Sequence, residues 1–191
     1  MAVKCSVYIA TSVDGYIAKP DGDIEWLHDP KYSEAKLNGL DYDDYISTVD
    51  VLVIGRNSYE KVRTFGFWPY ENILVVVLTS RPINIPKNLE GKVRVESCSP
   101  RHLVSVLGEE GKRHLYIDGG VTIQGFLRDG LINEITITQI PILLGSGIPL
   151  FGEAGMEFSL RLVDTAASDN GFVQVRYEVT CGADSERPIV A

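Results

Sequence analysis

The segment from His114 to Leu127 constrains the fold of this chain more than any other. It reads HLYIDGGVTIQGFL: residues with high strand propensity lead into Gly119-Gly120, and apolar residues at helical spacing follow at once. Because glycine has no Cβ, a ligand can approach the backbone closely at such a turn. The amides and the dipole of the helix start favour an anion there, such as a dinucleotide pyrophosphate. A tight strand-to-helix turn without a ligand is the alternative.

Short apolar runs alternate with helical patterns over most of the chain. Runs such as ILVVVL at 73–78 suit parallel strands that are buried on both faces. Strands are predicted at 5–10, 51–54, 73–78, 93–96, 115–117 and 134–140, and helices at 33–46, 57–64, 101–110 and after Gly119-Gly120. The β–α–β order implies right-handed crossovers in one sheet. The predicted fold class is therefore α/β, with a mostly parallel central sheet flanked by helices.

The C-terminal part departs from this rhythm. Two strand patterns, at 161–167 and 172–179, are joined by Ser-Asp-Asn-Gly, and Asn-Gly before a strand is a strong hairpin signal. We therefore expect an antiparallel C-terminal hairpin whose second strand, with alternating polar and apolar residues, has one wet face. No linker or repeat is visible, so we expect one domain over residues 1–181. The small, polar residues 182–191 are expected to form a disordered tail.

Composition narrows the classes of function. The chain has 191 residues and a net charge of −8 without a run of Lys or Arg, which argues against a nucleic-acid partner. It shows no signal peptide and no apolar run long enough to cross a bilayer, so no membrane partner is expected. Three distant cysteines and three scattered histidines form neither a disulfide framework nor a metal pattern. We expect a cytoplasmic protein without a metal.

Two further polar segments follow predicted strands, at the edge where open α/β sheets bind ligands. Gly55-Arg56 follows the strand at 51–54, and Thr79-Ser80-Arg81 follows the strand at 73–78. A guanidinium with a hydroxyl suits a phosphate monoester such as the 2′-phosphate of NADPH. Taken alone, each segment is better explained as a surface arginine or a polar turn. Together with Gly119-Gly120 they favour a nucleotide site, although the G-x-G-x-x-G fingerprint is absent.

Two loops and one aspartate have both a structural and a functional interpretation. The loop from Asp14 to Asp23 contains two Asp-Gly turns and is either a lid over a ligand or a surface hairpin. The run PILLGSGIPLF at 141–151 is either a structural turn or a contact with the substrate. Asp29 either caps the first helix or, beside Trp26, has a raised pKa and supplies a proton. Capping is the commoner role for such an aspartate.

In this order, the segments resemble the dihydrofolate reductase-like fold over residues 5–179. The chain is most similar to the reductase domain of the bifunctional riboflavin-biosynthesis deaminase-reductase and to stand-alone proteins akin to it. True dihydrofolate reductases lack the run that ends in GSGIPLF. The resemblance rests on SVDGYIA at 12–18, Gly55-Arg56, Asp118-Gly119-Gly120, Asn133-Glu134 and IPILLGSGIPLF at 140–151.

The resemblance implies an NADPH-dependent reductase and a homodimer. The implied substrate is 5-amino-6-(5-phosphoribosylamino)uracil, whose ribose is reduced to a ribityl chain by hydride transfer. The implied cofactor residues are Gly119, Gly120, Val121 and Thr122 at the pyrophosphate, Gly55, Arg56 and Ser58 at phosphate, Thr79, Ser80 and Arg81 at the adenosine end, and Ala10 and Ile17 at the nicotinamide. The candidate catalytic residues for the proton are Asp29 and then Asp14, with a relayed water as the third possibility.

Two departures from these families bear on the substrate. Where dihydrofolate reductases carry an arginine for the folate glutamate, this chain has Glu71, which would repel that carboxylate. The substrate-phosphate signature of the riboflavin enzymes is not found in residues 20–50, where Lys31 and Lys36 are the only lysine or arginine residues. Three functions remain in view: a pyrimidine reductase of the riboflavin type, a dihydrofolate reductase, and a non-catalytic module that binds NADPH.

Overall fold

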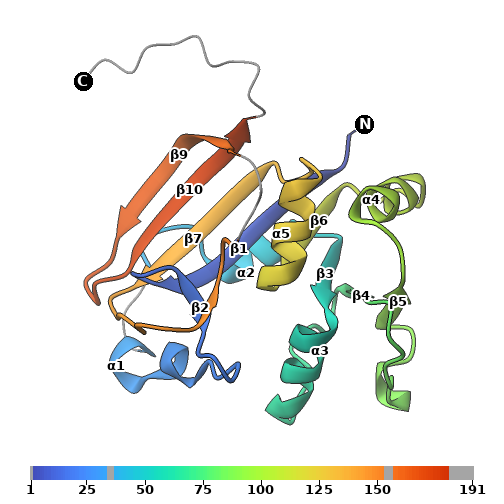
Figure 1. Cartoon of the computed structure of the whole chain (residues 1–191), viewed down its shortest axis with the longest axis horizontal. Coiled ribbons are helices and arrows are strands. Elements are labelled where there is room, and N and C mark those ends of the chain that lie inside the picture. Colours follow the sequence, from blue (N-terminus) through green and yellow to red (C-terminus); the bar gives the residue numbers. More distant parts are fainter. Residues whose placement is uncertain (1, 34–36, 153–156, 181–191) are drawn as a thin grey trace.

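An eight-stranded sheet forms the centre of the computed structural model, which describes residues 2–33, 37–152 and 157–180 (Figure 1). The strand order is β5-β4-β3-β6-β1-β7-β10-β9. Neighbouring strands from β5 to β7 run parallel, and β10 runs antiparallel to both β7 and β9. The predicted mostly parallel sheet with an antiparallel hairpin is therefore confirmed. The strands are β1 (Lys4–Ser12), β3 (Val51–Gly55), β4 (Leu74–Leu78), β5 (Val93–Glu96), β6 (His114–Asp118), β7 (Glu134–Ile140), β9 (Ser159–Ala167) and β10 (Val173–Thr180).

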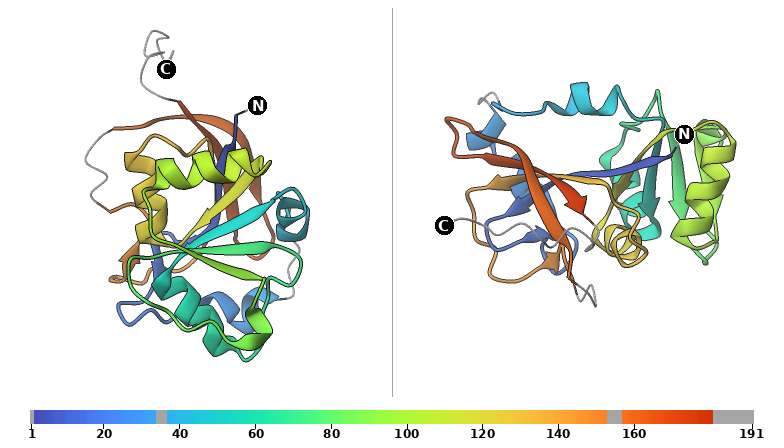
Figure 2. Two further views of the ribbon diagram at one scale, coloured as in Figure 1. Left: turned by 90° about the vertical axis from the view of Figure 1, so that its right-hand side faces the viewer. Right: turned by 90° about the horizontal axis from the view of Figure 1, so that it is seen from above.

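Helices cover both faces of this sheet, and Figure 2 shows α2 and α5 on opposite sides of it. Such double cover explains why the middle strands are apolar throughout: residues 51–54 of β3 and 75–77 of β4 are fully buried. The helices are α1 (Pro30–Ser33), α2 (Tyr42–Ile46), α3 (Arg56–Val62), α4 (Pro100–Glu109) and α5 (Gly120–Arg128), with short 3₁₀ turns at Glu25–His28, Arg63–Phe65 and Lys87–Leu89.

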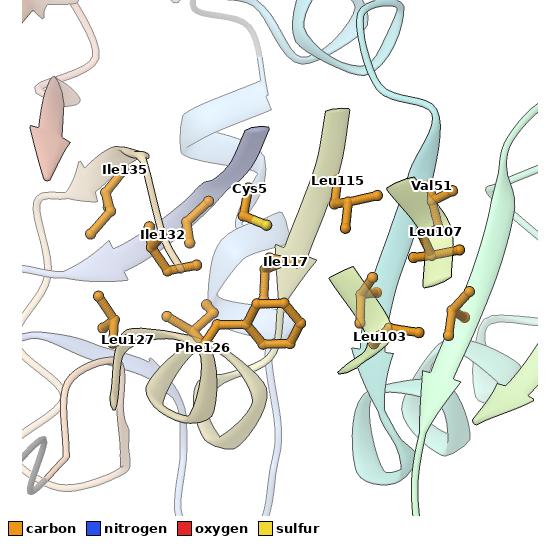
Figure 3. Close-up of a cluster of buried hydrophobic side chains, with 14 of the residues drawn as sticks. Cys5, Val51, Leu103, Leu107, Leu115, Ile117, Phe126, Leu127, Ile132 and Ile135 are labelled. Carbon is orange, nitrogen blue, oxygen red and sulfur yellow. The ribbon is translucent and has the colours of Figure 1, made fainter. Parts of the chain in front are cut away.

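The core on the face of α4 and α5 is built around Phe126, which is fully buried (Figure 3). Strand residues such as Ile117 and Ile135 belong to the same cluster, and α4 adds Leu103. Cys5 is also buried there, and burial raises the pKa of its thiol to about 12. The thiol therefore stays protonated and serves as a packing group. This cluster fixes α5, and with it the turn that precedes α5, against the sheet.

The predicted single helix at 33–46 is wrong over residues 37–41. The chain there is irregular, and α2 begins only after Asp41, whose carboxylate accepts the Asp43 amide at 2.8 Å. The irregular segment is tied to β10, because the Leu40 amide donates to Gln174 Oε1 at 2.6 Å. Gly39 packs against the same Gln174 side chain, where a Cβ would overlap it. Tertiary hydrogen bonds thus replace helical ones; residues 34–36 lie outside the described residues.

The C-terminal hairpin confirms one expectation and corrects another. The predicted turn at 168–171 is present, with Gly171 at φ 84° and a bond of 2.9 Å from the Ser168 amide to the Phe172 carbonyl. The expected wet face of β10 is present only in part, because Gln174 is 4% exposed whereas the Glu178 side chain is 46% exposed. The Gln174 side-chain amide donates hydrogen bonds to Thr138 Oγ1 at 3.1 Å and to the Leu40 carbonyl. The predicted tail at 182–191 lies outside the described residues.

Two further observations on the described residues concern membranes and metal ions. No helix in them is long and apolar enough to cross a membrane. Nor do three His, Cys, Asp or Glu side chains come together there in a group that could hold a metal ion.

Candidate functional site

The carboxyl ends of the parallel strands form one edge of the sheet, and the three polar segments meet there. The register pairs Ile54 of β3 with Asp118 of β6, and Gly55 with Leu78 of β4. The residues that follow, Arg56, Thr79 and Gly119, therefore start at the same level of the sheet. In Figure 1 this edge faces the bottom, where α3 continues from β3. The sequence prediction that these segments share an edge is confirmed.

The N-terminus of α5 offers unpaired amides at this edge. Gly119 precedes the helix at φ 88°, and no side chain caps the helix there. The first helical hydrogen bond runs from Ile123 N to Gly119 O at 2.9 Å. In the part of the chain that the structure describes, the amides of Gly120, Val121 and Thr122 have no partner. This helix of nine residues therefore presents donors and a positive dipole end that suit an anion.

Residues from three elements close tightly around this helix start. A Cβ on Gly55 would lie 2.9 Å from Thr122 Oγ1, and a Cβ on Gly119 would overlap Ser58 Oγ. We call Gly55, Ser58, Gly119 and Thr122 the glycine cradle. The absence of a Cβ at its two glycines lets its two hydroxyls pack against the backbone, and these hydroxyls can donate to phosphate oxygens. The cradle is therefore lined by hydrogen-bond donors rather than by apolar side chains.

Arg56, the predicted phosphate ligand, is the first residue of α3. Its Nε lies 3.8 Å from Glu60 Oε1 on the next turn of the helix. The alternative interpretation, an arginine paired with a nearby acid, is thus what the structure shows. An exposed pair at that distance is weak, so the guanidinium stays available to a second anion near the glycine cradle.

Thr79, Ser80 and Arg81 form a turn directly after β4. The Arg81 amide donates to Thr79 Oγ1 at 3.1 Å, and the Thr79 amide donates to Glu96 O at 2.9 Å. A shallow pocket of about 320 Å³ opens beside this turn. Its lining residues are Leu78, Thr79, Ser80, Ser97 and Cys98. The turn thus borders a small open pocket whose lining includes three hydroxyl-bearing residues, Thr79, Ser80 and Ser97.

A second, two-stranded sheet stands next to α5. It pairs β2 (Tyr16–Ala18) with β8 (Ile148–Pro149) in antiparallel fashion. Ile17 reaches to 3.1 Å and the Pro149 carbonyl to 3.2 Å from the position of a Cβ on Gly120. Ala10, the other predicted nicotinamide neighbour, is partly buried against the cluster of Trp26 and Ile140. The pairing favours the hairpin interpretation of the loop that contains β2.

Asp14 anchors the segment at 141–151. Its carboxylate accepts the amides of Gly145 at 2.7 Å and Leu144 at 3.1 Å. The Ser12 side chain, and then these amides, lower the pKa of Asp14. Asp14 is therefore ionised and engaged, which suits a structural anchor better than a proton donor. The segment at 141–151 is correspondingly held as a structural turn.

Asp29 caps α1. Its Oδ1 accepts the Lys31 amide at 3.1 Å, and its Oδ2 pairs with Lys31 Nζ at 3.0 Å. Lys31 thereby lowers the pKa of Asp29, so the expected raised pKa beside Trp26 is wrong. Trp26 itself is buried with Tyr32 and Ile140, and its indole N–H has no partner among the described residues. The capping role of Asp29 is confirmed, and a partner with an opposite charge explains its pKa.

Asp118 is the ionisable residue that sequence reasoning missed. It ends β6 directly before Gly119, and burial raises its pKa from the usual 3.8 to about 6. The Gly119 amide opposes this shift, and no lysine or arginine of the described ranges helps to stabilise the charged form. A carboxyl group poised near neutral pH at a ligand-binding edge is a candidate for proton chemistry. In the sequence, its position directly after the apolar run Leu-Tyr-Ile indicates that the carboxyl group is partly buried.

A cluster of tyrosine rings packs on the face of α2, and the charge of Asp118 acts on several of them. Tyr8 stacks on Tyr45 at 4.8 Å and meets Tyr42 edge-on at 5.7 Å, while Tyr45 lies 5.2 Å from Tyr116. We call Tyr8, Tyr42, Tyr45 and Tyr116 the tyrosine wall. Desolvation, and after it the charge of Asp118, raises the pKa of Tyr42 to about 12 and also raises the pKa of Tyr116 well above its usual value. The wall is therefore neutral across the physiological range, and Tyr45 and Tyr116 are part of the buried core.

Comparisons with known proteins identify the family and the relatives of this chain. The model of the RibD C-terminal domain family matches residues 4–174. The uncharacterised protein YwjB of Bacillus subtilis (strain 168) is 36% identical over 167 residues, which cover 86% of this chain and 92% of YwjB. A crystal structure of a Shewanella sp. PV-4 protein named for riboflavin biosynthesis is 38% identical, with a TM-score of 0.82, and the match covers 95% of this chain and all of that one.

A more distant match extends the likeness of the fold. The deaminase/5-amino-6-(5-phosphoribosylamino)uracil reductase of Thermotoga maritima is 14% identical, with a TM-score of 0.68 over 94% of this chain and 57% of that protein. At this identity the likeness concerns the fold alone. The family, in contrast, is shown by a model that spans most of the chain and by a relative of similar length. This chain therefore belongs to the RibD C-terminal domain family, the reductase domain of riboflavin-biosynthesis enzymes.

Proposed function

We propose that this protein is an NADPH-dependent reductase that transfers a hydride to a small nitrogen heterocycle. The observation that carries the proposal is the glycine cradle beside the uncapped start of α5. A cradle that excludes a Cβ at Gly55 and Gly119, together with three unpaired amides, suits a diphosphate bridge. The family is a reductase family, which fits the same chemistry.

The residues around the glycine cradle divide the cofactor among them in this proposal. Gly120, Val121 and Thr122 donate amides to the diphosphate, and Arg56 adds a charge. The turn of Thr79, Ser80 and Arg81 holds the adenosine end, with its pocket beside it. Arg81 and Ser80 together suit the 2′-phosphate that distinguishes NADPH from NADH. Ile17 and Ala10 border the nicotinamide, which when bound supplies the hydride.

Asp118 is the proposed proton-handling residue, in place of Asp29 and Asp14. Reduction of a C=N bond places a hydride on carbon and a proton on nitrogen, so the ring nitrogen must be protonated or hydrogen-bonded. Asp29 and Asp14 are ionised and engaged by their own partners. Asp118, with its pKa near 6, can accept a ring N–H and stabilise the protonated ring, which accepts a hydride more readily. The tyrosine wall would shield this site from water.

We also propose that the protein is a cytoplasmic homodimer. β9 is the outermost strand, and along it Leu160 and Leu162 are 44% and 52% exposed on one face. A long, exposed edge strand with apolar residues supports pairing with another chain. Cys5 and Cys98 are free thiols, which fits a reducing compartment.

The structure weakens one argument against the dihydrofolate reductase alternative. Glu71 forms an ion pair with Lys92, so its charge is partly compensated and repels a folate carboxylate less than the sequence alone suggests. The third possibility, a module that binds NADPH without turnover, is distinguished by kinetics rather than by geometry.

Calorimetry and isotope transfer test the proposal together. The protein is titrated with NADPH and with NADH, and we expect micromolar binding of NADPH. Turnover is then followed with NADPH deuterated at C4 and with 5-amino-6-(5-phosphoribosylamino)uracil, its unphosphorylated analogue and dihydrofolate as acceptors. Transfer of deuterium to a heterocycle supports the reductase, and binding without transfer to any acceptor indicates the non-catalytic module. If neither nucleotide produces heat on titration, the cofactor assignment is wrong.

A further inference from the structure

The side chain of His114 is buried at the amino end of β6, the opposite end of the strand from Asp118. Its Nε2 lies 2.6 Å from Ser6 Oγ of β1, and Ser6 Oγ lies 2.8 Å from Tyr45 Oη of α2. On the other side of the ring, Nδ1 lies 3.0 Å from the Thr48 carbonyl oxygen. We call Tyr45, Ser6 and His114 the latch, because they link α2 to two central strands of the sheet.

The partners of the His114 ring fix the direction of every hydrogen bond in the latch. The Thr48 carbonyl can only accept, so Nδ1 carries the hydrogen of the neutral ring and Nε2 must accept. Ser6 therefore donates to His114, and Tyr45 donates to Ser6, so that each hydrogen of the latch has one acceptor. A Ser–His pair is also the arrangement that activates a nucleophile, but Ser6 is completely buried, so no substrate reaches it.

Protonation of the ring adds one hydrogen for which the latch has no acceptor. With Nε2 protonated, His114 must donate to Ser6, Ser6 must turn to donate to Tyr45, and the Tyr45 hydroxyl loses its own acceptor. Among the described residues, Ser6 Oγ is the one hydrogen-bond partner of Tyr45 Oη, and Tyr45 is only 3% exposed to water. A buried donor without a partner is costly, and so is the buried charge on the ring.

Burial is the largest influence on the His114 ring, and it lowers the pKa of this histidine. The Thr48 carbonyl opposes this shift, as do the charges of Glu134 on β7 and Asp50 before β3, whereas Lys4 of β1 acts in the same direction as burial. Lys4 and Glu134 form an ion pair at 3.2 Å, so their effects on the ring largely cancel. Asp50 accepts the backbone amide of His114 at 2.9 Å. The neighbouring charges therefore do not compensate a cation in the latch.

The other acids near α2 do not account for an effect of this sign. Asp43 and Asp44 in the first turn of α2 are not among the groups that act on His114. Asp118 acts on Tyr45 through its charge, but its pKa is raised, so the folded state takes up that proton and acid is stabilising. The pKa of His114 is lowered, so the open state takes up its proton first, and stability is lost as pH falls below the usual value of 6.5.

We propose that the latch holds α2 on the sheet only while the His114 ring is neutral, so that mild acid releases α2 while the sheet stays folded. α2 is suited to such a local opening because it is short and Tyr45 is its buried residue. Tyr45 stacks on Tyr8 at 4.8 Å and meets Tyr116 edge-on at 5.2 Å, so its release uncovers these two rings of the tyrosine wall. The core on the face of α4 and α5 does not include the latch and keeps the sheet together.

Hydrogen exchange and ring nitrogen shifts, both followed by NMR on the full chain, test the latch. The nitrogen shifts at pH 7.5 should place the hydrogen of the His114 ring on Nδ1. The protection of the Tyr45 and Ser47 amides, which donate within α2, is compared at pH 7.5 and pH 5.0 after correction for the intrinsic exchange rate. We expect it to fall by about tenfold, the factor for one pH unit of differential proton binding. The amides of β4 exchange through global unfolding, in which Asp118 offsets His114, and should change by less than about threefold.

Variants assign the loss of protection to the ring. His114→Gln carries an amide that does not titrate, so the protection of α2 should no longer depend on pH between 7.5 and 5.0. His102→Gln, on the exposed side of α4, is the matched control and should retain the tenfold loss. Asp118→Asn should retain it as well, because the sign of the effect excludes Asp118 as its source.

Four results would overturn the inference. They are a ring hydrogen on Nε2 at pH 7.5, unchanged protection of α2 at pH 5.0, a loss that persists in His114→Gln, and an equal loss in β4, which would mean that acid unfolds the whole chain. The ring shifts and the comparison of α2 with β4 in the unmodified protein decide the matter even if His114→Gln does not fold.

Discussion

Gly119 and Ser58 lie so close together that a Cβ on Gly119 would overlap the Ser58 hydroxyl oxygen. The starts of α3 and α5 are thus in contact across the ends of β3 and β6. Gly119 also has φ 88°, a conformation that side chains rarely adopt. Glycine is therefore required here for two separate reasons, backbone conformation and space, and the two can be separated by mutation.

Gly119→Ala is expected to abolish tight NADPH binding. The added methyl group forces α3 and α5 apart and disturbs the glycine cradle, so affinity should fall by about a hundredfold, with about 1–3 kcal/mol of stability lost to backbone strain. Calorimetry and urea denaturation measure the two effects. Gly111→Ala is the matched control: Gly111 has φ 87° with no atom within 4 Å of an added Cβ. It should lose similar stability yet keep its affinity, and equal losses of affinity would contradict the role of the cradle.

Arg81→Ala is expected to weaken NADPH binding far more than NADH binding. Only NADPH carries the 2′-phosphate, and one charge-assisted contact corresponds to about tenfold or more in affinity. Calorimetric titration with both nucleotides gives the ratio. Arg128→Ala, at the opposite end of α5, serves as the control for a lost positive charge. If Arg81→Ala weakens both nucleotides equally, the assignment of the 2′-phosphate to Arg81 is wrong.

Asp118→Asn is expected to stabilise the protein at neutral pH. The folded state holds the Asp118 proton up to about pH 6, whereas the unfolded state releases it near the usual value of 3.8. Folding stability therefore falls as pH rises through this window, and the full cost is present above pH 6. The variant has no carboxyl group to ionise and so avoids this cost. Its free energy of unfolding should rise by about 1–3 kcal/mol at pH 7 and by little at pH 4. Urea denaturation at both pH values measures this, and a gain that does not depend on pH would contradict the raised pKa.

Asp29→Asn and Asp14→Asn are expected to leave the pH dependence of kcat/KM unchanged. Both carboxylates have lowered pKa values because of their own partners, so neither titrates in the working range. Asp118→Asn, in contrast, should remove an inflection near pH 6. Burial and the charge of Asp118 raise the pKa values of Tyr42, Tyr45, Tyr70 and Tyr116, so these groups do not titrate below pH 9. Loss of the inflection in Asp29→Asn would restore Asp29 as the proton donor.

The fold was largely predictable from the sequence because local pattern and tertiary structure agree in most elements. The apolar run in β4 and the turn at Asn170-Gly171 needed no distant partner to be recognised. Prediction failed where a distant side chain decides, as when Gln174 binds Leu40 and replaces the expected helix. The same applies to charge: the sequence placed Asp29 beside Trp26, but only the structure shows that Lys31 compensates it. Asp118 was overlooked because its desolvation depends on strands that are distant in sequence.

Leu162→Lys is expected to convert a dimer into a monomer. Leu160 and Leu162 share the face of β9 that pairs with Tyr177 and Val179 of β10, and both stay exposed. A lysine in the middle of that face places a desolvated charge in an interface, whereas it costs little in an isolated chain. Sedimentation equilibrium across a range of concentrations gives the mass. Leu143→Lys, on an exposed loop, is the control for added charge and should leave the mass unchanged. A wild-type protein that is monomeric at all concentrations would refute the homodimer, and a dimeric Leu162→Lys variant would assign the interface to another surface.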